Sequence, residues 1–97
     1  MTILTRGGLR RQGDSAAAVT LYEDLLARLR RAVGGDHAES LIAEHNLAVV
    51  VRACGDPPRA RELAAASLKH RRRVLGDDHP LTASSREFLA ETIAWQP

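Results

Sequence analysis

The stretch GDPPRARELAAASLKHRRRVLGDDH, from Gly55 to His79, decides the fold, because the chain contains a second version of it. The earlier version is GDSAAAVTLYEDLLARLRRAVGGDH, from Gly13 to His37, and the offset between the two is 42 residues throughout. Residues that are identical at this offset gather at predicted helix ends or on one helical face: Gly13, Asp14, Ala18, Leu21, Leu26, Arg30, Arg31, Gly34, Asp36, His37, Leu47 and Ala48. One fixed offset indicates a repeat protein, in which similar units stack on one another.

Length and composition restrict the possible functions. At 97 residues the chain fits one domain and is shorter than a typical catalytic domain. Charged residues make up 27% and the net charge is +2, which indicates neither disorder nor a dominating electrostatic field. No run of about eighteen apolar residues is present, so we expect no membrane span. Cys54 is the single cysteine, which fits a reducing compartment, and we predict the cytoplasm.

The spacing of apolar residues predicts a succession of helices. Residues 1–12 read as a short helix, and the three-four spacing then predicts amphipathic helices over 15–33, 38–54, 57–75 and 80–95. The connections are only a few residues long, so neighbouring helices should be antiparallel.

Turn residues mark the predicted helix ends. Gly13 and Asp14 should end the first helix and cap the second, and Asp36 with Glu39 resembles a capping box. His37 and His79 occupy equivalent turns, about 10 Å or more apart in a stack, which is too far to share one metal ion. We therefore interpret both histidines as structural capping residues.

The packing residues resemble the tetratricopeptide repeat. The resemblance rests on this order of small and large residues: Leu47, Ala48, Val51, Gly55, Ala60, Ala64, Ser67 and Leu68. The period of 42 exceeds the family's usual 34 residues and is similar to the kinesin light chain type. The resemblance implies an all-α fold of antiparallel helix-turn-helix repeats, stacked as a right-handed α-solenoid of about five helices.

The resemblance also divides the single domain, residues 1–97, into repeats. It implies the following parts: 1–12 as the remnant of a first helix, 13–37 as the second helix of repeat 1, 38–76 as a complete repeat 2, and 77–97 as the first helix of repeat 3. The two ends of such an array would normally be covered by another repeat or a cap.

In this family the first helices line a concave groove that holds a peptide. By position, the groove would present Ile42, His45, Asn46, Val49, Arg52 and Ala53 from one helix, and Ser84, Glu87, Phe88, Glu91 and Trp95 from the next. The Asn46 amide would bond a ligand backbone with donor and acceptor together, or else be a solvated polar group. Phe88 stands at the equivalent place in the third repeat.

Two of these groove assignments have alternatives. Arg52 could bind a ligand carboxylate bidentately, or pair internally with Glu87 or Glu91. Trp95 and Phe88 could anchor a partner, or Trp95 could cover the open end of the stack.

The leading functional prediction is a non-enzymatic scaffold that binds a protein or peptide segment, within a larger regulator. One alternative is a homo-oligomerisation module that uses the exposed ends of the array. A weaker one is nucleic-acid binding by an arginine ridge made of Arg28, Arg30 and Arg31 with Arg71, Arg72 and Arg73. No catalytic motif or phosphate-binding loop is recognisable, so we expect no cofactor and no metal.

Overall fold

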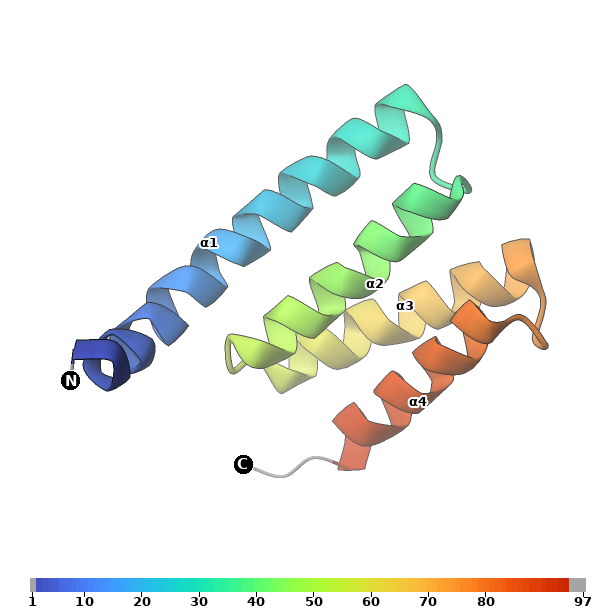
Figure 1. Cartoon of the computed structure of the whole chain (residues 1–97). Coiled ribbons are helices and arrows are strands. Elements are labelled where there is room, and N and C mark those ends of the chain that lie inside the picture. Colours follow the sequence, from blue (N-terminus) through green and yellow to red (C-terminus); the bar gives the residue numbers. More distant parts are fainter. Residues whose placement is uncertain (1, 95–97) are drawn as a thin grey trace.

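The computed structural model describes the backbone of residues 2–94 and the side chains of residues 16–94. It contains four helices, α1 (Thr2–Ala32), α2 (Ala38–Ala53), α3 (Pro57–Leu75) and α4 (Pro80–Ala94), and these residues form no strand (Figure 1). The all-helical prediction is confirmed, whereas the expected number of about five helices is wrong.

The helices follow one another as antiparallel neighbours. α1 packs on α2, α2 on α3, and α3 on α4, and Figure 1 shows α3 behind α2 and α4. The longest dimension of the molecule is 47 Å, close to the ~46 Å expected for a helix as long as α1. Among the described residues, no helix combines the length and the apolar character that crossing a membrane requires.

The missing helix is explained by α1, which runs without a break through Gly13 and Asp14. At the equivalent place, Gly55 adopts φ 92° and the chain turns into α3. The difference lies in the next two residues. Pro57 and Pro58 have no amide hydrogen and would clash with the preceding turn of a continuous helix, whereas the first copy has serine and alanine there. The predicted stop at residues 13–14 was wrong because glycine alone only weakens a helix, by about 1 kcal/mol.

Two apolar clusters hold the helices together. The first joins α1, α2 and α3 and contains Leu26, Ala43, Leu47, Val51 and Ala60; the second joins α2, α3 and α4 and contains Ala48, Ala64 and Phe88. Alanine dominates the α2–α3 contact, and its small side chain lets the two backbones approach closely. Each cluster thus links one pair of helices to the next helix of the chain, as stacking requires.

The turns before α2 and α4 are capped by histidine. His37 Nδ1 accepts a hydrogen bond from the Glu39 amide at 3.1 Å, and His79 Nδ1 accepts one from the Leu81 amide at 3.0 Å. The capping role predicted for both histidines is confirmed. The cap of α2 is His37 and not Asp36, because the Asp36 carboxylate bonds to α3 instead.

A buried arginine ties three helices together. Arg71 on α3 is 2% exposed, and its guanidinium donates to the carbonyl of Leu41 on α2 at 3.1 Å and to that of Leu81 on α4 at 2.6 Å. Burial lowers the pKa of Arg71, while the charge of Glu44 opposes this shift. Since a guanidinium can reach two carbonyls at once, one side chain fixes α3 against both of its neighbours.

Candidate functional site

The predicted groove residues form a stripe along α2 that faces α4 on one side and α1 on the other. Ile42 and Ala53 are exposed, and His45, Asn46, Val49 and Arg52 are half-buried. On α4, Ser84, Glu87 and Glu91 are exposed, whereas Phe88 is buried with 8% exposed. Trp95 lies outside the described residues.

Phe88 is the centre of the junction between α2 and α4. The His45 ring meets its ring edge-on with centroids 5.3 Å apart, and the Arg52 guanidinium lies 4.2 Å from its centroid. Ser85 on α4 also lies close to His45, with Oγ 3.4 Å from Nδ1. The structure therefore brings three predicted groove residues together, as contacts within the chain.

The environment of His45 favours its neutral form. Burial lowers the pKa of the His45 imidazole, and the positive charge of Arg71 lowers it further. Because a neutral imidazole can present an apolar edge to Phe88, this junction is part of the packing between α2 and α4.

Arg52 has internal partners on α4. Its Nη1 donates to the Thr92 hydroxyl at 3.0 Å and lies 3.8 Å from the Glu91 carboxylate. Of the two internal acids considered for Arg52, Glu91 is the one it meets. A ligand carboxylate would have to compete with these contacts for the guanidinium.

Asn46 lies on the other side of the stripe, beside α1. It lines a cleft of about 230 Å³ between α1 and α2, together with Tyr22, Leu25, Leu29, Glu39, Ile42 and Ala43. The prediction missed the three α1 residues of this cleft. The offset of 42 residues could have identified this face of α1, because Leu25 is equivalent to Ser67, which is fully buried in α3.

A second cleft lies between the far end of α2, α1 and the start of α3. Its volume is about 320 Å³, and its lining is Ala16, Val19, Val51, Cys54, Asp56 and Arg59. The ion pair between Arg59 Nη2 and Glu23, at 2.6 Å, links α3 to α1 near this cleft.

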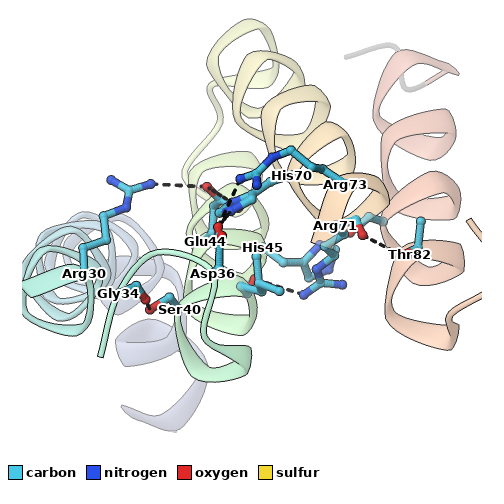
Figure 2. A network of polar contacts seen from close by, with 12 residues as sticks. Arg30, Gly34, Asp36, Ser40, Glu44, His45, His70, Arg71, Arg73 and Thr82 are labelled. Carbon is cyan, nitrogen blue, oxygen red and sulfur yellow. Dashed lines mark hydrogen bonds and ion pairs between the residues drawn. The ribbon is translucent and has the colours of Figure 1, made fainter. Parts of the chain in front are cut away.

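An ionic cluster around His70 was not predicted from the sequence. His70 on α3 places Nδ1 3.0 Å from Glu44 on α2 and Nε2 2.7 Å from Asp36 in the α1–α2 turn (Figure 2). Arg73 donates to Asp36 at 3.0 Å, and Arg30 on α1 donates to Glu44 at 3.2 Å. Hydrogen bonds from His70 and then from Arg73 hold the pKa of Asp36 below its ordinary value. The cluster joins α1, α2, α3 and one turn.

The cluster has the geometry of ion pairing and not of metal binding. The two ring nitrogens of His70 point at different carboxylates, so these groups do not converge on a single point. Among the residues that the structure describes, no three His, Cys, Asp or Glu side chains are placed to hold a metal ion.

Comparison with known proteins agrees with this arrangement of helices. A tetratricopeptide repeat family model matches residues 7–63 and again residues 39–94. The chain belongs to the tetratricopeptide repeat family. No curated protein and no solved structure matches it.

Family membership identifies the general class of function. Tetratricopeptide repeats generally mediate protein–protein interaction and are typically non-catalytic scaffolds. The first match spans α1, α2 and the start of α3, and the second spans α2, α3 and α4. The two matches overlap over residues 39–63, which cover α2 and the start of α3.

The predicted arginine ridge is divided by the tetratricopeptide packing. Arg71 is buried, Arg30 pairs with Glu44, Arg72 pairs with Asp77 at 3.0 Å, and Arg73 pairs with Asp36. These contacts direct the guanidinium groups to acids and carbonyls of the chain itself, which weakens the case for a continuous surface that would follow a phosphate backbone.

Proposed function

We propose that this chain is a non-enzymatic scaffold that binds a peptide or protein segment along the face shared by α2 and α4. The observation that carries the proposal is the half-buried stripe of α2. It offers apolar surface at Ile42 and Val49, with the Asn46 amide between them and the Phe88 junction beside them. A mixed surface of this kind suits an extended segment, because the apolar positions hold side chains while an amide holds the backbone.

The charges around the stripe suggest the chemistry of the segment. Glu87 and Glu91 on α4 are exposed, and Glu39 lies at the α1 side. Arg52, the cation within the stripe, is engaged by Thr92 and Glu91. We therefore expect a ligand that places an apolar side chain near Val49 and a lysine or arginine near Glu87. In this proposal Arg52 shapes the α2–α4 junction, and Asn46 orients the ligand.

A peptide selection tests the proposal. A random peptide library is selected against the chain, and the selected peptides are titrated calorimetrically. We expect Asn46→Ala to weaken binding about tenfold, the effect of one lost hydrogen-bonding side chain, and Glu87→Gln to reduce the salt dependence of binding. Lys69→Ala, on an exposed position of α3, is the control and should bind normally. Peptides that bind all variants equally would remove the face from consideration.

We further propose a subtype, a parent protein and a location. The period of 42 residues suggests the kinesin light chain type of repeat, the larger parent regulator is an expectation, and the cytoplasm is the predicted location. Nucleic-acid binding is the least favoured function, since four of the six arginines that suggested it contact acids or carbonyls of the chain: Arg30, Arg71, Arg72 and Arg73.

A further inference from the structure

The two ends of the helix array are complementary halves of one repeat. At the offset of 42 residues the part of α1 from residue 15 onward corresponds to α3, and α4 corresponds to α2, whereas residues 2–12 of α1 correspond to residues 44–54 at the end of α2. Within the chain α2 packs on α3. Over residues 2–94, however, no helix packs on α1 as α2 packs on α3, and none packs on α4 as α3 packs on α2.

Exposure at equivalent positions shows that both unpaired faces are apolar. Val51 on α2 is 1% exposed against α3, whereas its equivalent on α4, Ile93, is 57% exposed. Ser67 on α3 is fully buried, whereas its equivalent on α1, Leu25, is 43% exposed. Large apolar side chains thus stand uncovered at the positions that the α2–α3 pair covers.

Leu21 extends the same pattern along α1. It is 68% exposed, whereas its equivalent on α3, Leu63, is half-buried against both core clusters. Isolated exposed leucines are common on protein surfaces, but adjacent ones beside an apolar cleft are typical of an interaction surface.

We propose that the chain assembles head to tail, with α4 of one copy packing on α1 of the next copy as α2 packs on α3 within the chain. The second copy then fills the cleft of about 230 Å³ beside Tyr22 and Leu25, which corresponds to the place of α2 on the α3–α4 pair. Each joint combines two half repeats into one complete repeat.

The side chains at the joint suit a contact between copies. Leu25 and Leu29 of α1 stand where α3 has Ser67 and Arg71, so this face needs no buried carbonyl partners. From α4, Ala90 and Ile93 stand where α2 has Ala48 and Val51. The joint omits the buried Arg71 of the α2–α3 contact, which would be costly to desolvate. Arg28 and Arg86 stand where His70 and Glu44 pair within the chain, so that ion pair is not repeated at the joint.

One polar pair gives the joint its register. Within the chain His45 on α2 meets Phe88 on α4 at 5.3 Å. The corresponding residues across the joint are Glu87 of one copy and Asn46 of the next. There the Asn46 amide donates to the Glu87 carboxylate, a hydrogen bond that neither residue makes to the other within its own copy.

A head-to-tail contact uses different faces on the two copies and therefore does not close after two copies. It grows into a ring or a filament, unless one face is blocked. Growth needs no peptide, but the joint and the proposed ligand both use Asn46 and Glu87, so a bound peptide competes with assembly. The head-to-tail geometry also separates the proposal from a symmetric pair of α1 helices.

The experiment measures molar mass by light scattering and sedimentation from low to high micromolar concentration, starting from a monomer of 10.6 kDa. Two variants each block one face, Leu25→Asp on α1 and Ile93→Asp on α4. Because both side chains are exposed in the single copy, the helical circular dichroism should be unchanged. Ala66→Asp on α3 is the matched control, since its equivalent on α1 is already an acid, Asp24.

We expect the unmodified chain and the control to gain mass with concentration. Each blocked variant alone should stay monomeric, with association weakened about a hundredfold or more by an unpaired buried charge. An equal mixture of the two variants should form dimers and stop there, because each retains the face that the other has lost. The proposal is overturned if the unmodified chain is monomeric throughout, if Ile93→Asp still assembles, or if the mixture stays monomeric.

Discussion

Replacement of Phe88 by alanine should lower the free energy of unfolding by about 3 kcal/mol. Phe88 is buried, belongs to the cluster with Ala48 and Ala64, and meets the His45 ring and the Arg52 guanidinium. Removal of a buried phenylalanine costs roughly 3–5 kcal/mol, and this range contains the lost edge-on contact of about 1 kcal/mol and a cation–π contact of about 0.5–1 kcal/mol. The lower end applies because α4 packs mainly on α3 among the described helices and can therefore shift to reduce the cavity.

The assay is urea unfolding followed by circular dichroism, in the Ile93→Asp background so that assembly does not contribute to stability. A loss of this size is a large part of the roughly 5–15 kcal/mol available to a small domain and lowers the melting temperature by about 12–24 °C. Phe88→Leu is the matched variant. It keeps most of the buried volume, so it should lose about 1 kcal/mol.

A loss below about 1 kcal/mol for Phe88→Ala would refute the reasoning, because a side chain with these contacts cannot be removed so cheaply from a packed junction. The same pair of variants separates packing from ligand binding. If Phe88 acts through packing alone, Phe88→Leu binds selected peptides as the parent does. Weaker binding by the folded Phe88→Leu variant would instead show that the ring touches the ligand.

Three further predictions concern the buried arginine, a histidine and one turn. Arg71→Ala should lose about 3 kcal/mol or more in urea unfolding, since two carbonyls lose their donor. Arg71→Met should lose less because it keeps the aliphatic packing; an unchanged urea midpoint for Arg71→Met would contradict the role of the hydrogen bonds. Because burial lowers the pKa of His45, the unfolded chain takes up its proton first, so stability should be full above pH about 6.5 and fall below it. Urea midpoints at pH 7.5 and 5.5 should therefore differ less for His45→Asn than for the parent, and an equal difference would exclude this source. Gly55→Ala should lose about 1–2 kcal/mol, since φ 92° strains any side chain, and an unchanged melting temperature would show that the turn relaxes.

Protonation of Asp36 in the ionic cluster should also lower the stability of the fold, at a lower pH than protonation of His45. Since His70 and Arg73 hold the pKa of Asp36 below its ordinary value, the contribution of Asp36 is present at neutral pH and is lost as the pH falls through its folded pKa. Asp36 is exposed, so Asp36→Asn should cause only a small loss at neutral pH that disappears in acid.

Sequence alone determined which residues form helices in the central part of the chain. Proline, glycine and the three-four apolar spacing act locally, so the bounds of α3 and the histidine caps could be predicted from neighbouring residues. The offset of 42 residues also identified the kind of fold, because identical packing residues at one spacing imply equivalent places in a stack. The same local reasoning failed at Gly13, where α1 continues as a helix. The equivalent Gly55 lies in a turn, and there two prolines follow.

Only the tertiary structure decided what the groove residues contact. Arg52, Phe88 and Glu91 were all placed on the groove by position, yet their packing against one another depends on how far α4 lies from α2. The ionic contact of His70 with Asp36 joins residues 34 positions apart, and no local pattern reports it. Exposure of Leu25 and Ile93 is likewise a property of the whole array, because the same helix face is buried where a neighbour covers it and open where none does.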